Sequence, residues 1–156
     1  AKVKNMPGVT TTINFFQAYR QPQITVVDLP GYGFAFASEQ EREGWQQATQ
    51  SYLRDRKTLK RVMLLLDSRH GLKELDREKI RMLEELGKRY QVVLTKCDLI
   101  SGEELTQRML ITQAELKLLN QGNRVNPLLM VSSQTSAGLP RLREELGSLP
   151  QRKRRQ

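Results

Sequence analysis

Cysteine, histidine and long hydrophobic runs are scarce in this sequence. Its single cysteine, Cys97, excludes an internal disulfide framework and suits a reducing compartment. Its single histidine, His70, excludes metal ligation by a histidine pair, and a hydrogen bond in a loop is a simpler role for it than catalysis. No apolar run approaches the roughly 18 residues that a transmembrane helix needs, so we expect no membrane span.

Acidic residues are fewer than basic ones. The chain has 17 Asp and Glu against 26 Lys and Arg, which gives a formal net charge of +9. A basic surface that is simply hydrated accounts for such an excess. The functional interpretation is a polyanionic partner such as RNA, because positive charge near phosphates gains from counterion release. The length of 156 residues suits one domain with a sizeable core.

The first chemical signal lies between Ile24 and Gly31. All four residues at 24–27 are β-branched and predict a buried strand, which must stop at the Pro30-Gly31 turn. Asp28 therefore follows the strand at its carboxyl end, the edge where open parallel sheets bind ligands. There a carboxylate can hold Mg²⁺ and Gly31 lets a backbone N–H approach a phosphate. The pattern indicates metal-assisted handling of a nucleoside triphosphate, although a strand with an ordinary turn also fits.

A second apolar run, from Tyr90 to Leu94, leads into Thr95, Lys96 and Asp98. The Asp98 carboxylate can accept hydrogen bonds from the N1–H and exocyclic amine of guanine, a pair of donors that adenine does not offer. The aliphatic stem of Lys96 can lie across the base or the ribose. This stretch predicts a guanine-selective contact.

A third apolar run, from Leu128 to Val131, leads into Ser132, Ser133 and Gln134. The backbone N–H groups of the two serines could meet the carbonyl oxygen of guanine. One strand with a phosphate-and-metal signature and two with base signatures together predict a single purine-nucleotide site, because parallel strands bring their carboxyl ends to one edge.

Several motifs resemble those of the EngB family of ribosome-assembly P-loop GTPases. They are PGVTTTINFF (7–16), DLPGYGFA (28–35), LLLDSRHGLKELD (64–76), TKCDL (95–99) and VSSQTSAGL (131–139). The resemblance implies a three-layer α/β GTPase domain with a mostly parallel sheet over residues 1–149, followed by a basic tail at 150–156. It also implies GTP or GDP with Mg²⁺ as ligands.

The sequence lacks the Gly-x-x-x-x-Gly-Lys-Ser/Thr loop with which such GTPases hold the phosphates. In this fold the first strand lies between the strand that ends at Asp28 and the one that ends at Asp67. A chain without it would leave two unpaired strand edges facing a gap, which is costly. We therefore expect the first strand and the P-loop to precede Ala1 in the complete protein rather than to have degenerated.

The resemblance assigns roles to individual residues. Thr10 matches the switch threonine that contacts Mg²⁺ and the γ-phosphate, Asp28 matches the second metal contact, and Gly31 the glycine at the γ-phosphate. The implied guanine site consists of Thr95, Lys96, Asp98, Ser132, Ser133 and Gln134. Tyr32 stands where many GTPases carry the glutamine that orients water, so we expect slow intrinsic hydrolysis that a ribosomal partner or a monovalent ion assists.

The resemblance also implies partners and a location. We expect a monomer that binds a large-subunit precursor through rRNA and ribosomal proteins or other assembly factors. The stretch from Tyr90 onwards is nearer to organellar members, which favours a mitochondrion, with a plastid or a bacterial cytoplasm as alternatives. A competing hypothesis is a nucleotide-free docking protein that keeps the fold and a basic surface. The third hypothesis is a GTPase that acts in signalling or transport, and the net charge gives it little support.

Periodicity and capping signals predict the other elements. The expected helices are Ser38 (N-cap) to Asp55, 75–86, 103–120 and 139–146, and further strands are expected at 13–18 and 62–67. In the first helix the predicted core positions are Trp45, Ala48, Tyr52 and Leu53. In the third they are Leu105, Met109, Ala114, Leu116 and Leu119.

Overall fold

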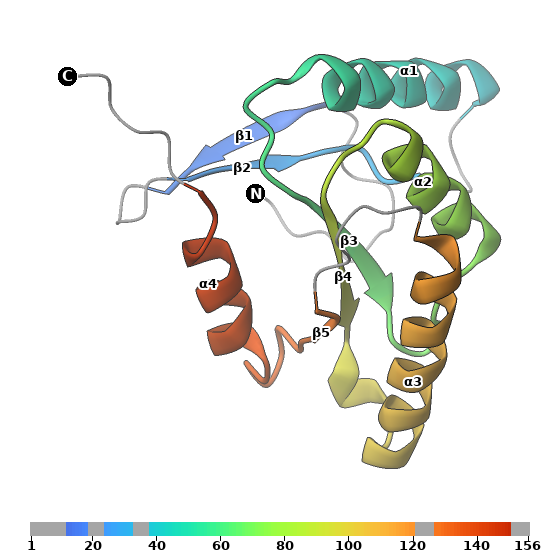
Figure 1. Ribbon diagram of the computed structural model, residues 1–156, viewed down its shortest axis with the longest axis vertical. Coiled ribbons are helices and arrows are strands. Elements are labelled where there is room, and N and C mark those ends of the chain that lie inside the picture. The colour runs from blue at the N-terminus through green and yellow to red at the C-terminus, as the bar shows by residue number, and fades with distance from the viewer. Residues whose placement is uncertain (1–11, 19–23, 33–37, 121–126, 151–156) are drawn as a thin grey trace. The chain divides into compact units, whose positions relative to one another are not determined.

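The computed structural model describes residues 12–18, 24–32, 38–120 and 127–150 (Figure 1). These fall into two compact units, an N-terminal unit that ends at Thr58 and a C-terminal unit from Leu59 to Pro150. The predicted basic tail lies outside the described residues, except for Pro150.

The N-terminal unit contains an antiparallel strand pair. Strand β1 (Asn14–Gln17), predicted at 13–18, pairs with β2 (Thr25–Asp28), with Asn14 opposite Asp28. The prediction that residues 24–27 are buried is wrong: Thr25 and Val26 are exposed, Val26 to 48%, and Ile24 and Val27 are only partly buried. Among the described strands β2 pairs with β1 alone, so it is an edge strand and lacks the second neighbour that a buried strand needs.

Helix α1 (Glu39–Asp55) begins at the predicted capping box. The Ser38 hydroxyl accepts a hydrogen bond from the Glu41 N–H at 3.3 Å, and the Ser38 N–H donates to the Glu41 carboxylate at 3.0 Å. The Ser38 hydroxyl also donates to the Glu41 carboxylate at 2.7 Å, and this bond, together with the one from the Ser38 N–H, lowers the pKa of Glu41.

One face of α1 is covered. Leu53 is buried, and the ring of Tyr52 lies edge-on to that of Phe15 in β1, with 6.1 Å between their centroids. The predicted core position Ala48 is exposed. The covered residues Trp45 and Leu53 are eight positions apart on one helical face, and Ala48 lies beside that face.

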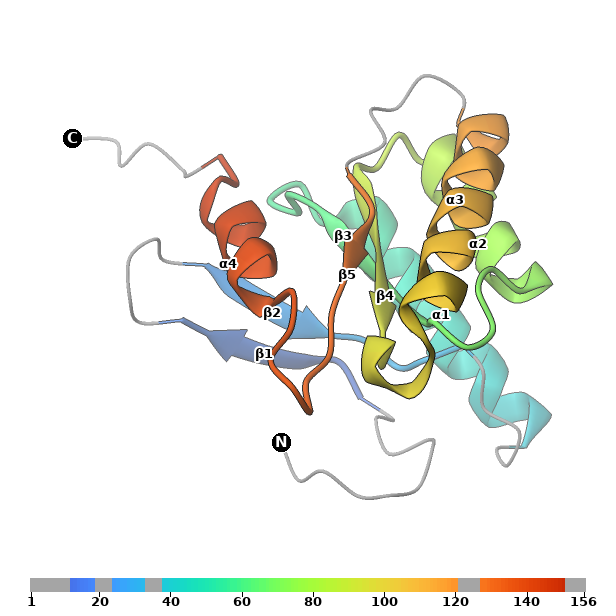
Figure 2. The same cartoon turned by 90° about the horizontal axis from the view of Figure 1, so that it is seen from below.

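The C-terminal unit is a three-layer α/β structure. Its parallel sheet has the order β3 (Val62–Asp67), β4 (Tyr90–Thr95), β5 (Leu129–Met130). Helices α2 (Glu74–Glu85) and α3 (Gly102–Leu119) lie on one side of the sheet and α4 (Leu139–Gly147) on the other, as Figures 1 and 2 show. The described strands form two sheets rather than one, because none of them pairs with both β2 and β3.

Both faces of this sheet carry core residues. Val93, Leu129 and Val131 form a buried cluster on the α4 side, against which Met63, Leu139 and Leu142 pack. Side chains alternate along a strand, so the opposite face carries another buried set: Leu64, Leu66, Val92 and Leu94. Strand β4 is central and therefore buried almost throughout.

Of the predicted core positions of α3, Leu116 is buried. The prediction is wrong for Ala114, which is exposed, and the others, Leu105, Met109 and Leu119, are only partly buried. The stripe that includes Leu116 also holds the buried Thr112, which the prediction missed. Leu105, Met109, Thr112, Leu116 and Leu119 recur every three or four residues and so share one face. Ala114 lies off this face, which α3 turns to its neighbours.

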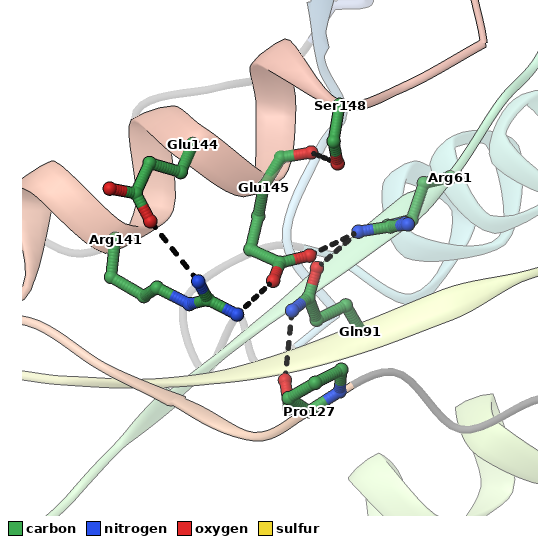
Figure 3. Close-up of polar contacts among 7 residues, drawn as sticks. All are labelled: Arg61, Gln91, Pro127, Arg141, Glu144, Glu145 and Ser148. Atoms are coloured by element: carbon green, nitrogen blue, oxygen red, sulfur yellow. Dashed lines mark hydrogen bonds and ion pairs between the residues drawn. The ribbon is translucent and has the colours of Figure 1, made fainter.

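A polar network attaches α4 to the sheet (Figure 3). The Arg61 guanidinium donates to the Gln91 side-chain oxygen at 2.8 Å and to Glu145 at 3.1 Å, and Gln91 in turn donates to the carbonyl of Pro127 at 2.8 Å. Arg141 pairs with Glu145 at 2.9 Å. The side chains of Arg61 and Glu145 are only 12% and 13% exposed, so this ion pair is largely shielded from water.

Replacing Glu145 is therefore expected to destabilise the protein. Glu145→Gln leaves Arg61 beside a neutral partner in a shielded place, and we expect it to lower the free energy of unfolding by about 1–2 kcal/mol. The matched control is Glu144→Gln. That side chain also pairs with Arg141 but is 67% exposed, so its loss should cost less than about 0.5 kcal/mol. Urea unfolding measures the loss in free energy of unfolding for both variants. Equal losses would show that the shielded Glu145 stabilises the protein no more than the exposed Glu144.

Candidate functional site

Three polar loops meet at the carboxyl edge of the β3-β4-β5 sheet. The Ser68 N–H, just after β3, donates to the carbonyl of Thr95 at 3.0 Å. The Val131 N–H donates to Leu94 at 2.8 Å, and the Cys97 N–H donates to Val131 at 3.2 Å. These bonds extend the pairing beyond the strands, so the structure brings the loop of Lys96 and Asp98 next to the loop of Ser132 and Ser133.

Lys96 holds the loop after β4 in a sharp turn. Its backbone is left-handed, with φ 57° and ψ 35°, a conformation that costs a residue with a side chain about 1 kcal/mol or more. The Ser68 hydroxyl, which is fully buried, donates to the Lys96 carbonyl at 3.1 Å. The turn leads directly into a short 3₁₀ helix, Cys97–Leu99, which carries Asp98.

The Asp67 carboxylate at the end of β3 accepts four hydrogen bonds. One oxygen accepts from the Arg69 N–H at 3.1 Å and from Arg69 Nε at 2.9 Å; the other accepts from Arg69 Nη2 at 2.7 Å and from Lys96 Nζ at 2.9 Å. The Arg69 guanidinium and the Lys96 ammonium hold the pKa of Asp67 well below its usual range. Asp67 therefore stays ionised at neutral pH.

Asp98 is exposed, and among the described residues no hydrogen bond or ion pair engages its carboxylate. The carboxylate is thus available to a ligand. Two neighbours serve the loop itself: the Thr95 hydroxyl donates to the Leu66 carbonyl at 2.9 Å, and the Cys97 thiol donates to the Leu94 carbonyl at 3.2 Å. Burial raises the pKa of the Cys97 thiol, which disfavours the thiolate form.

Ser132 organises the loop after β5. Its buried hydroxyl accepts hydrogen bonds from the N–H groups of Gln134 at 3.2 Å and Thr135 at 3.1 Å. Its own N–H donates to the carbonyl of Ala137 at 3.0 Å. Of the two serine amides predicted to face a base carbonyl, the Ser132 N–H is thus engaged within the loop, which leaves the exposed Ser133 as the predicted donor.

The predicted phosphate and metal residues belong to the N-terminal unit. Asp28 ends β2 and is partly buried, and Gly31 is exposed, whereas Thr10 lies outside the described residues. No cluster of three or more Asp, Glu, His or Cys side chains able to hold a metal occurs in the described part of the chain. A Mg²⁺ ion bound to nucleotide phosphates needs no such cluster, because one or two protein oxygens suffice. The Asp28 carboxylate is a donor of that kind.

Sequence reasoning missed Asp67 and Ser68 as members of the loop cluster. The signal was present, since Asp67 also follows a buried apolar run, but no base or phosphate role marked it.

Within the described segments, no helix is both long and apolar enough to cross a membrane.

The chain is similar to known GTP-binding proteins. A family model described as a 50S ribosome-binding GTPase matches residues 1–96. The probable GTP-binding protein EngB of Rhodospirillum rubrum is 40% identical over 153 residues, which cover 96% of this chain and 65% of that protein. The EngB protein of Bartonella tribocorum is 41% identical over 150 residues, with coverages of 92% and 69%. The chain thus spans about two thirds of the length of these relatives.

Two solved structures share the fold. Era, crystallised with MgGDPNP and nucleotides 1506–1542 of 16S ribosomal RNA, matches with a TM-score of 0.76 at 18% identity, over 99% of this chain and 50% of that one. A probable GTP-binding protein EngB matches with a TM-score of 0.65, also at 18% identity, over 88% of this chain and 82% of that one.

Proposed function

Because the chain belongs to the EngB family of GTP-binding proteins, we propose that it binds GTP and GDP with Mg²⁺, hydrolyses GTP, and acts in assembly of the large ribosomal subunit. The observation that carries the nucleotide proposal is the meeting of the Lys96–Asp98 and Ser132–Gln134 loops at one sheet edge, with an exposed carboxylate in the first loop. Guanine is the base whose donors fit a carboxylate and whose carbonyl fits a backbone N–H.

Each residue then has a defined task. Asp98 accepts the N1–H and the exocyclic amine of guanine, and the Ser133 N–H donates to the carbonyl oxygen. The stem of Lys96 covers one face of the base, while Ser132, Thr95 and Gln134 keep the loops in shape through the hydrogen bonds of Ser132 and Thr95.

The phosphate end of the proposal rests on the N-terminal unit. Mg²⁺, when bound, neutralises charge on the transferred phosphoryl group. Asp28 and Thr10 would hold it, and the Gly31 amide would approach the γ-phosphate. With Tyr32 following Gly31, no glutamine orients water there, so the proposed hydrolysis is slow unless a ribosomal partner or a monovalent ion assists.

The proposed partner is a precursor of the large ribosomal subunit, bound through rRNA and ribosomal proteins or other assembly factors by a monomer. Two observations support it: the matching family is described as ribosome-binding, and the chain carries a formal net charge of +9. The mitochondrion is the proposed location, with a plastid or a bacterial cytoplasm as alternatives.

The experiment compares GDP with ADP by equilibrium binding to the same protein. The ratio of the two affinities is the readout, because the phosphates are identical and only the base differs. A site built to accept two guanine donors should favour GDP by about a hundredfold or more. Equal affinities would contradict the assigned guanine contacts, and binding of neither nucleotide by the full-length protein would favour the alternative of a nucleotide-free docking protein.

A further inference from the structure

The ion cluster of Asp67, Arg69 and Lys96 links two loops at the proposed base site. Asp67 ends β3, whereas Lys96 follows β4, and 2.9 Å separates the Asp67 carboxylate from the Lys96 ammonium. The Lys96 side chain is 54% exposed. A long exposed lysine ordinarily samples many rotamers, and holding it in one costs conformational entropy. Because Asp67 holds the Lys96 ammonium in the unliganded protein, part of this entropy is already lost before a ligand binds.

The backbone of Lys96 is held from the same turn. Ser68 bonds the Lys96 carbonyl and the Thr95 carbonyl through its hydroxyl and its N–H, at 3.1 and 3.0 Å. Lys96 is thus held at both ends by consecutive residues, its main chain by Ser68 and its ammonium by Asp67. The direction in which the aliphatic stem runs between these two points is therefore set by the protein.

The turn that carries Asp67 is itself held in place. Arg108 of α3 donates to the carbonyls of Arg69 at 3.1 Å and His70 at 3.4 Å. Arg69 grips Asp67 through both carboxylate oxygens, and a carboxylate has about four acceptor positions, so the Lys96 ammonium shares the group without displacing Arg69.

We propose that Asp67 is a positioning residue for guanine recognition: it holds the Lys96 ammonium at the end of β3, so that the lysine stem is prearranged to cover the base. The inference rests on the proposed function, since it assumes that Lys96 covers a guanine. Asp67 itself touches no nucleotide. Its contribution to binding is the ordering of Lys96 in advance.

A double-mutant cycle tests the inference. Asp67→Asn keeps the shape of the side chain and removes its charge; we expect GDP affinity to fall about five- to tenfold, with the GDP contact at Asp98 intact. In a Lys96→Met background the same change should alter GDP affinity by less than about twofold, because the group that Asp67 positions is gone. A purely structural role would give the same fold-change in both backgrounds and would overturn the inference.

Two further variants separate positioning from general damage. Asp67→Glu keeps a carboxylate for both cations and should retain most of the GDP affinity. Glu74→Gln is the matched control, because Glu74 also bridges two cations, Arg81 at 3.0 Å and Arg77 at 3.4 Å, on the surface of α2. It should leave GDP affinity unchanged. A loss as large as that of Asp67→Asn would contradict the proposal.

A readout without nucleotide keeps the inference distinct from the proposed function. The rate of Lys96 acetylation by acetic anhydride, measured by mass spectrometry against the exposed Lys117, should rise severalfold in Asp67→Asn, because the carboxylate no longer covers the ammonium. An unchanged rate would show that Asp67 does not hold the Lys96 ammonium and would overturn the inference. If the wild type binds no guanine nucleotide and the rate still rises in Asp67→Asn, the proposed function is overturned while the contact between Asp67 and Lys96 is supported.

Discussion

Asp98→Asn is expected to reverse the base preference of the protein, from guanine towards xanthine nucleotides, by about a hundredfold. Xanthine has a carbonyl where guanine has its exocyclic amine. An asparagine amide can accept from N1–H and donate to that carbonyl, whereas with guanine its NH₂ group would face another donor. Competition between GDP and XDP for binding to wild-type and variant protein measures the ratio.

The structure makes this variant easy to interpret. The Asp98 carboxylate is exposed and engages no described partner, so its replacement should leave the free energy of unfolding within about 0.5 kcal/mol of the wild type. Glu103→Gln, an exposed carboxylate in the first turn of α3, is the matched control and should not change base preference. Equal loss of GDP and XDP binding in Asp98→Asn would contradict the assigned contact.

The same variant tests the ribosomal part of the proposal. If a bound triphosphate nucleotide is what allows association with a large-subunit precursor, Asp98→Asn protein should sediment with precursor particles in the presence of XTP and no longer with GTP. Sedimentation that is indifferent to the nucleotide would favour the docking protein over the switch.

Gly138→Ala is expected to destabilise the C-terminal unit by about 3 kcal/mol or more. Gly138 lies between the Ser132–Gln134 loop and α4, with φ at +73°. A Cβ atom there would lie 1.9 Å from the carbonyl oxygen of Met130 and 3.3 Å from the Cα of Val131. Both are backbone atoms, so relief requires α4 or β5 to move, and with them the cluster of Val93, Leu129 and Val131.

Gly87→Ala is the matched control for this prediction. Gly87 also has a positive φ, +62°, but nothing lies within 4 Å of the added Cβ. It should therefore cost only the backbone strain, about 1 kcal/mol. Urea unfolding followed by circular dichroism measures both variants. Equal losses of stability would mean that the close contact of the added Cβ with β5 does not contribute to the destabilisation in Gly138→Ala.

The sequence predicted local features well because their causes are local. The capping box of Ser38 with Glu41 marked the start of α1, and the apolar runs before Asp67 and Thr95 marked β3 and β4. Burial was predicted less well. Val26, Ala48 and Ala114 are apolar yet exposed, since the burial of a side chain depends on what packs against its face and not on its own character.

The candidate site also combines features that the sequence predicted with features that only the folded structure showed. The motifs that follow two apolar runs, together with the family resemblance, indicated Lys96, Asp98 and Ser133. Only the folded structure showed that Ser132 spends its N–H within its own loop, and that Asp67 and Ser68 hold Lys96 at both ends. In the sequence Lys96 is 28 positions from Ser68 and 29 from Asp67.

The sequence by itself determined the type of this protein: its alternating strands and helices, its membership of a GTP-binding family, and the residues that could read a guanine. The tertiary structure decided which of those residues are free to contact a ligand and which are committed to the scaffold. The physical reason is that a donor and an acceptor must come within about 3 Å of each other, and only the folded loops bring the Ser132 N–H to Ala137, and Asp67 and Ser68 to Lys96.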